Sequence, residues 1–201
     1  FRENKQNKER AEILSHELLE MRFEVLKNQI DPHFMFNNLN TLAALIDSNQ
    51  AKAQQFIEEF SDLHRYVLDT IEQPVVTVAQ ELKFIKSYVF LQQMRHNEAI
   101  ILHDAIPEEV YDLHIPPFSL QIVIENAIKH NAADISRPLK IELSYINGCL
   151  EVKNNISTPI SSRPSTGLGQ NNLMKRYQLL SETLPTCVKK EDTYIVRLPF
   201  I

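Results

Sequence analysis

The segment PPFSLQIVIENAIKHN places an amide, an ammonium group and an imidazole on one face of a predicted helix. Asn126, Lys129 and His130 fall at positions i, i+3 and i+4, which lie on the same side of a helix. Such a set suits a phosphate ligand that carries a metal ion, because an amide oxygen binds the metal and cations bind phosphate oxygens. Glu125 adjoins this face. The simpler alternative is an ordinary solvated helix face.

Two glycines form a second candidate site. Gly167 and Gly169 are two of only three glycines in the chain, and they lie just before another predicted helix. Paired glycines let backbone amides approach a phosphate at a helix N-terminus, although glycines also make ordinary turns. Neither GxxxxGK[ST] nor GxGxxG occurs, so neither a P-loop nor a Rossmann dinucleotide-binding site is supported.

His33 is the third candidate. One helical face carries an apolar row that turns polar, in the order Leu19, Phe23, Leu26, Ile30, His33, Asn37 and Asn40. Pro32 removes a backbone hydrogen bond within the same predicted helix and bends it, at a cost of about 3 kcal/mol. A kink of that cost beside a newly polar face favours a functional His33. The alternative is an exposed histidine beside an incidental kink.

The N-terminal third reads as two long helices, because residues up to about 71 contain no glycine and a single proline. One heptad seam runs through Leu14, Leu18, Met21, Val25, Asn28, Pro32, Met35, Leu39, Leu42 and Ile46, and another through Phe56, Phe60, Leu63 and Val67. A turn cluster at residues 47–50 separates them. Two helices cannot enclose a core alone, so we expect a homodimer that forms a four-helix bundle.

The register breaks at Gln73-Pro74, which predicts a helical dimerisation domain over residues 1–73 and a second domain over residues 74–201. Helical and strand-like stretches alternate in the second domain. Strands are expected over residues 99–106, 139–146, 149–156, 186–190 and 194–199. This order predicts an α+β sandwich, with helices packed on one face of a mixed sheet.

Local signals mark the ends of several elements in this second domain. Thr77, with Gln80 three residues later, predicts a capped helix to about residue 96. A second helix, to about residue 131, is expected to open at Pro116-Pro117, since proline suits a first turn. Asn147-Gly148 predicts a hairpin turn between two strands. A third helix is expected over residues 170–181.

The composition is that of an ordinary globular chain, with 43% hydrophobic and 23% charged residues. The net charge of −5 does not favour direct binding of nucleic acid. Cys149 and Cys187 are expected to be reduced, buried thiols, because free cysteines are usually buried, and the absence of CxxC spacing argues against a zinc site. No stretch is apolar enough to span a membrane, yet the chain begins without methionine. We therefore expect a piece of a longer protein whose membrane anchor lies upstream.

Three motifs together resemble those of LytS-like sensor histidine kinases. LKNQIDPHFMFNNLNTLAALI resembles that family's phosphoacceptor helix, whose hallmark is Gln-x-x-Pro-His-Phe-x-x-Asn-x-Leu-Asn. The matching positions are Gln29, Pro32, His33, Phe34, Asn37, Leu39 and Asn40. LQIVIENAIKHN is similar to the family's N box, and GLGQNNLMKRY to its glycine-containing lid motif. The motifs stand in the family's order and cover most of the chain.

The resemblance implies a dimeric helical domain joined to an ATP-binding domain of the GHKL type, which is an α/β sandwich. His33 would be phosphorylated by ATP, with Asp31 as the candidate to orient its ring or take its proton, and Asn126 would bind Mg²⁺. The residues implied at the ATP site are Glu125, Asn126, Lys129, His130, Asn154, Gly167, Gly169, Asn172 and Arg176. The phosphoryl group would pass to an aspartate on the receiver domain of a response regulator. The chain would be the cytoplasmic domain of a bacterial inner-membrane sensor.

The chain departs from this family at three positions. In the stretch LEVKNNIST, Asn154 stands where the family has the Asp that accepts a hydrogen bond from the adenine amino group, and Asn155 is the adjacent alternative. Gln170 replaces a leucine in the lid motif, and Asn131 replaces a glycine that is common at the end of the N box. An uncharged amide should accept the adenine bond more weakly than a carboxylate.

These departures keep a second function open. The chain could be a pseudokinase scaffold that binds nucleotide weakly or not at all and signals through its dimer conformation. A third reading, an ATPase of the same fold without a phosphohistidine, is disfavoured by the helix that carries Pro32 and His33.

Overall fold

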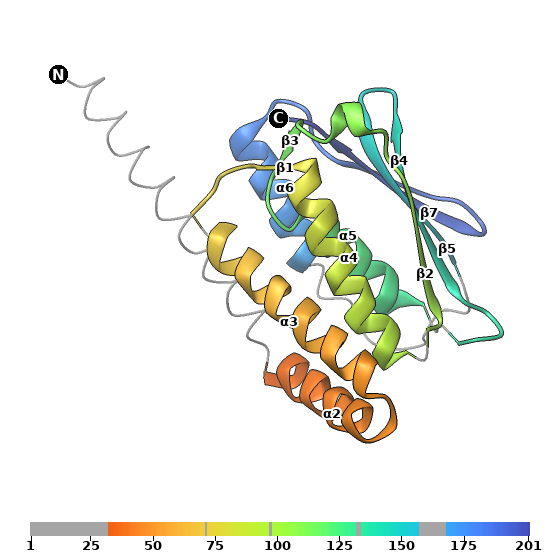
Figure 1. Cartoon of the computed structure of the whole chain (residues 1–201). Coiled ribbons are helices and arrows are strands. Elements are labelled where there is room, and N and C mark those ends of the chain that lie inside the picture. The colour runs from red at the N-terminus through yellow and green to blue at the C-terminus, as the bar shows by residue number, and fades with distance from the viewer. Residues whose placement is uncertain (1–31, 71, 97, 132–133, 157–167) are drawn as a thin grey trace.

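The protein is arranged in three layers in the computed structural model, which describes residues 32–70, 72–96, 98–131, 134–156 and 168–201. The side chains of Pro32, His33 and Leu168 lie outside that description. A twisted sheet forms one layer, three helices cover one of its faces, and a helical hairpin packs on the outer side of those helices (Figure 1). The predicted α+β fold with a mixed sheet is confirmed.

The sheet has five strands in the order β2-β4-β5-β7-β6. Their bounds are β2 Ile100–Ala105, β4 Leu139–Ile146, β5 Cys149–Asn155, β6 Thr186–Lys189 and β7 Thr193–Pro199. β2 pairs parallel to β4 and the other neighbours pair antiparallel, so the sheet is mixed as predicted. Asn147 and Gly148 join β4 to β5 with φ values of 51° and 78°, the left-handed pair that a two-residue hairpin needs.

Three short elements were not predicted. β1 (Val76–Thr77) pairs antiparallel with β3 (His114–Ile115), and a 3-10 helix spans Glu108–Val110. Elements of two or three residues are too short to show a hydrophobic period, so no sequence pattern could reveal them.

The helical layer consists of α4 (Val78–Arg95), α5 (Ser119–His130) and α6 (Leu168–Leu180). Thr77 caps α4 with the predicted capping box, in which Gln80 donates its backbone N–H to the threonine hydroxyl. The prediction that Pro116-Pro117 occupy the first turn of α5 is wrong. Phe118 adopts a left-handed φ of 64° immediately before the helix, so the two prolines lie in the preceding turn.

α6 begins at Leu168, two residues earlier than expected, and this places Gly169 inside its first turn. The expectation of buried thiols is also wrong for Cys187, which is exposed because it lies on the edge strand β6. Cys149 is half-buried, and both thiols are free.

The hairpin consists of α2 (Pro32–Ser48) and α3 (Gln50–Thr70), with the predicted turn between them. Any helix before Pro32 lies outside the described residues. Phe56, Leu63 and Val67 of α3 are buried in the same apolar cluster as the helices and sheet of the C-terminal part. A domain boundary at residues 73 and 74 stays a prediction, and across it the two parts share this core.

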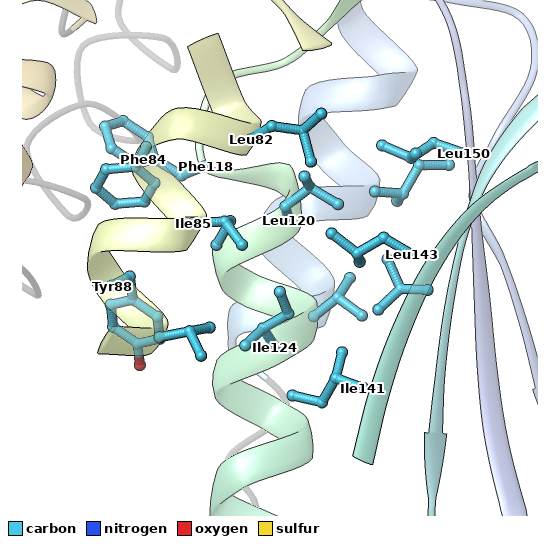
Figure 2. Packing of buried hydrophobic residues seen from close by; sticks show 14 of the residues in the cluster. Leu82, Phe84, Ile85, Tyr88, Phe118, Leu120, Ile124, Ile141, Leu143 and Leu150 are labelled. Carbon is cyan, nitrogen blue, oxygen red and sulfur yellow. The ribbon is translucent and has the colours of Figure 1, made fainter. Parts of the chain in front are cut away.

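The core that holds the helices on the sheet is visible in Figure 2. Ile85 of α4 faces Leu120 and Ile124 of α5, whose other neighbours are Leu143 and Leu150 of the sheet. All five side chains are almost fully buried. Among the described helices, none combines the length and the apolar character that crossing a bilayer requires.

Candidate functional site

α5 buries one side and presents the other as a polar face. Leu120, Val123, Ile124 and Ala127 are buried, whereas Asn126 is half-buried and Lys129 and His130 are exposed. Lys129 Nζ forms an ion pair with Glu125 Oε1 one turn before it. The helix therefore places the predicted N-box residues on adjacent turns, with the ammonium group already beside a carboxylate.

The start of α6 lies against this helix. A side chain at Gly169 would place its Cβ 3.5 Å from Ile122 Cγ2. Ile122 lies one turn before Asn126 and thus on the same side of α5. The first turn of α6 consequently stands at the edge of the polar face of α5.

The same turn of α6 also contacts the end of the sheet. Gln170 Nε2 donates a hydrogen bond of 2.8 Å to the Tyr194 hydroxyl on β7. Tyr194 is the direct antiparallel partner of Asn154 on β5, so both side chains project from the same face of the sheet. That face is the one covered by helices, since Val152 and Val196 on it are buried.

Asn154 and Asn155 differ in what their amides do. Asn154 is 3% exposed on the helix-covered face, and its Nδ2 donates to the Asn155 carbonyl at 2.7 Å, which turns its Oδ1 the other way. Asn155 instead ties β5 to β4: its Oδ1 accepts from the Lys140 N–H at 2.7 Å and its Nδ2 donates to the Pro138 carbonyl at 3.1 Å. Of the two, Asn154 is the side chain that faces the helices with an oriented acceptor.

Arg176 points into the protein. It is buried, and its Nη1 donates to the Pro117 carbonyl at 2.7 Å, in the turn before α5. Asn172 lies half-buried one turn earlier on α6. A role for either residue at the phosphates stays a prediction. Asn131, at the end of the N-box motif, is buried and donates its Nδ2 to the Ala127 carbonyl at 2.7 Å, which caps the C-terminus of α5.

A buried carboxylate that the sequence did not signal lies at the other end of α5. Glu81 of α4 is 0% exposed, and its Oε1 accepts from the Tyr66 hydroxyl and from the Phe118 N–H, each at 2.5 Å. Its Oε2 accepts from the Leu120 N–H at 3.0 Å. We call Tyr66, Glu81, Phe118, Leu120 and Arg176 the Glu81 junction. Because Glu81 stands in a helical first turn, where acidic residues are common, nothing in the pattern marked it as buried.

Burial raises the pKa of the Glu81 carboxyl, while the donors from Tyr66, Leu120 and Phe118 and the charge of Arg176 act in the opposite direction. Burial also raises the pKa of the Tyr66 phenol, and Glu81 adds to the rise. The phenol therefore remains protonated and acts as the donor.

The helix that carries His33 begins against α4. The ring of Phe34 stacks on Tyr88 with centroids 6.4 Å apart. Burial and then the charge of Glu125 raise the pKa of Tyr88. The His33 side chain, Asp31 and Gly167 lie outside the described residues, and their predicted roles stay predictions.

Known proteins match this chain in both halves. The family model described as histidine kinase matches residues 21–100. The sensor histidine kinase/phosphatase LytS of Staphylococcus aureus (strain Mu50) is 33% identical over 136 residues, and the LytS of strain N315 matches equally. The matched segment is 68% of this chain and 23% of LytS, so the chain spans about a quarter of the relative's length. With its three motifs, the chain belongs to the LytS-like family of histidine kinases.

Two solved structures were also found to be similar. The Acinetobacter baumannii histidine kinase AdeS has a TM-score of 0.43 and 13% identity, over 78% of this chain and 82% of AdeS. The catalytic domain of histidine kinase ThkA has a TM-score of 0.41 and 16% identity, over 62% of this chain and 93% of that domain. At these scores the likeness adds nothing to the description of the sheet and helices above.

Proposed function

We propose that this chain is the core of a two-component sensor histidine kinase that uses ATP and Mg²⁺ to phosphorylate its own His33. One observation carries the proposal. The first turn of α6 contacts the Asn126 side of α5 through Gly169 and Ile122, and it contacts the Asn154 end of the sheet through Gln170 and Tyr194. A phosphate-binding face and a base-binding acceptor thus border the same short segment.

The nucleotide would lie with its base at Asn154 and its phosphates along α5. The oriented Oδ1 of Asn154 suits the amino group of adenine, whereas guanine presents a carbonyl oxygen there and would be rejected. Lys129 and His130 are exposed and within reach of phosphate oxygens from the last turn of α5.

The residues present fit a magnesium ion that arrives with ATP. Within the described parts of the chain, no group of three or more His, Cys, Asp or Glu side chains is placed to hold a metal ion. Mg²⁺ in phosphoryl-transfer sites is held by one or two side-chain oxygens together with substrate phosphates, and Asn126 offers such an oxygen. When bound, the ion would neutralise charge on the phosphates.

The transfer itself needs only a nucleophile and a leaving group. A neutral ring nitrogen of His33 attacks the γ-phosphorus, the N–P bond forms, and the bond to the β,γ-bridging oxygen breaks as ADP leaves. The ring then loses the proton of its other nitrogen, for which Asp31 is the candidate acceptor. In the second reaction the N–P bond breaks as an aspartate oxygen of a response-regulator receiver domain takes the phosphoryl group.

The outer face of the hairpin supports the homodimer. Large apolar side chains there are exposed, including Phe36 at 65%, Leu39 at 51%, Ile46 at 59%, Ile57 at 49% and Leu68 at 69%. An apolar face of this size on a two-helix hairpin suits a second copy, since two hairpins make a four-helix bundle. By family resemblance, we place this core on the cytoplasmic side of a bacterial membrane sensor whose anchor lies upstream.

Radiolabelled ATP with Mg²⁺ tests the proposal. The protein should take up label at an acid-labile site, and His33→Gln should abolish the label. His103→Gln, which changes an exposed histidine on β2, is the matched control and should label normally. Label that persists in His33→Gln would show that another residue accepts the phosphoryl group.

A pseudokinase scaffold is the second candidate, favoured by the amide of Asn154 in place of a carboxylate. Titration calorimetry with ATP and Mg²⁺ separates the two. No detectable binding at millimolar nucleotide would favour the scaffold, and measurable binding with an unlabelled His33 would favour a nucleotide sensor without kinase activity.

A further inference from the structure

The N-terminus of α5 is capped by residues distant in sequence. Phe118, the N-cap residue, is left-handed and makes no side-chain cap, so the first N–H groups of the helix need other acceptors. Glu81 of α4 supplies them through its bonds to the N–H groups of Phe118 and Leu120. A carboxylate at this end also complements the helix dipole. The position of α5, which carries Asn126, therefore depends on Glu81.

Glu81 in turn depends on the hairpin. Tyr66 of α3 donates its hydroxyl to the same Oε1 that caps Phe118. The Tyr66 ring stacks on Phe84 at a centroid distance of 4.4 Å and meets Phe118 edge-on at 5.5 Å. Because Tyr66 lies on α3 and Glu81 lies on α4, the hydroxyl reaches Glu81 only while α3 is docked on α4.

α6 joins the junction from the other side. Arg176 donates to the Pro117 carbonyl, one residue before Phe118, and its charge acts on both Glu81 and Tyr66. α6 also carries Gly169 and Gln170 in its first turn. The hairpin, α4, α5 and α6 thus meet at one buried carboxylate, and two of these helices border the nucleotide site proposed above.

We propose that Tyr66 and Glu81 are positioning residues through which docking of the α2–α3 hairpin sets the affinity of the nucleotide site. When the hairpin leaves α4, Glu81 loses the Tyr66 hydroxyl and the cap on α5 loosens, so that α5 and α6 no longer hold their nucleotide-binding arrangement. The inference rests on the proposed function, since it takes α5 and α6 to bind ATP. Linkage then requires the reverse effect: nucleotide must stabilise the docked hairpin by the same factor.

Amide hydrogen exchange of the whole chain, with and without a non-hydrolysable ATP analogue and Mg²⁺, tests this linkage. The analogue prevents phosphorylation of His33 from contributing. We expect the analogue to slow exchange in α5 and α6 and also in α3, the last by about fivefold or more, the usual lower range of coupling between sites. A purely structural role for the junction would leave α3 unaffected.

Tyr66→Phe is the variant that isolates the hydroxyl, since the ring contacts with Phe84 and Phe118 remain. It should abolish the slowing of exchange in α3 and raise the Kd of the analogue by a similar factor, about fivefold. Tyr145→Phe, on the exposed end of β4, is the matched control and should behave as wild type.

The outcomes separate this inference from the proposed function. Slowing in α5 and α6 with unchanged exchange in α3 of the wild type refutes the coupling but leaves the kinase proposal intact. Unchanged exchange everywhere, with no heat of binding, refutes both. If the analogue still slows amide exchange in α3 of Tyr66→Phe, Tyr66 is not the residue that couples the hairpin to the nucleotide site. Should that variant fail to fold, the wild-type comparison still decides whether the hairpin and the nucleotide site are coupled.

Discussion

Replacing Glu81 with leucine should destabilise the protein far more than any surface change on α4. The leucine fills a similar volume but accepts no hydrogen bond, so it leaves three buried donors unpaired: the Tyr66 hydroxyl and the N–H groups of Phe118 and Leu120. Each unpaired buried donor costs about 1–3 kcal/mol. Partial rearrangement of the Phe118 turn reduces the sum, and we expect a loss of about 3–5 kcal/mol in the free energy of unfolding.

Urea denaturation followed by circular dichroism measures this loss. With a typical slope of about 2 kcal/mol per molar urea, the midpoint should fall by about 2 M. Lys83→Leu is the matched control, because Lys83 also bridges α4 to α3, through Asp62 at 3.2 Å, but is solvent-exposed. That surface pair should contribute less than about 1 kcal/mol. A Glu81→Leu midpoint within the range of the control would refute the assigned role of the junction.

Comparison with Glu81→Gln shows how the ionisation of Glu81 changes the stability of the protein with pH. Because burial raises the folded-state pKa of Glu81, the folded protein binds this proton more tightly than the unfolded chain does. Relative to Glu81→Gln, the wild type should therefore have its full extra stability below the pKa that Glu81 has in the unfolded chain. That extra stability should be lost as pH rises through the folded-state pKa of Glu81. A difference between the two proteins that does not change with pH would contradict this.

Three further predictions concern the proposed nucleotide site and dimer. Asn154→Asp should tighten ATP binding by about fivefold in calorimetry, since a charged acceptor makes a hydrogen bond about twice as strong, and a weaker affinity would argue against adenine at this position. Gln170→Leu and Tyr194→Phe each remove the same hydrogen bond, which contributes about 0.5–1.5 kcal/mol to stability. In a double-mutant cycle, the double variant should therefore be no less stable than either single variant. Leu39→Glu with Ile46→Glu, on the exposed face of α2, should convert a dimer to a monomer in sedimentation, with helix content unchanged; a persistent dimer would move the interface elsewhere.

Elements with local signals were predictable from the sequence. The capping box at Thr77 and the hairpin at Asn147-Gly148 depend on residues within three positions of one another, so a short stretch of chain suffices to specify them. Strand-like stretches likewise located the five strands of the sheet, and the glycine-free stretch located the hairpin helices. The prolines before α5 misled the prediction, because the left-handed turn at Phe118 is held by Glu81 from a different helix.

Part of the candidate site was likewise predictable from the sequence, and part was visible only in the tertiary structure. The residue types in the three motifs identified the family and the face of α5 that bears Asn126, and they are the basis of the proposed phosphoryl transfer. Only the tertiary structure showed that Asn154 rather than Asn155 faces the helices, because that depends on how β5 pairs with β4 and β7. The same is true of the partnership between Gln170 and Tyr194, which are 24 residues apart.

The three sequence motifs by themselves determined the family to which this protein belongs. Each motif is a run of neighbouring residues, so its residue types and their spacing can be read directly from the sequence. What joins those motifs was decided by the fold. Glu81, Tyr66 and Arg176 come from three different helices, and no pattern within one helix distinguishes a solvated carboxylate from one enclosed by three others. Burial turns an ordinary first-turn glutamate into an acceptor that joins Tyr66 of the hairpin to the N-terminus of α5.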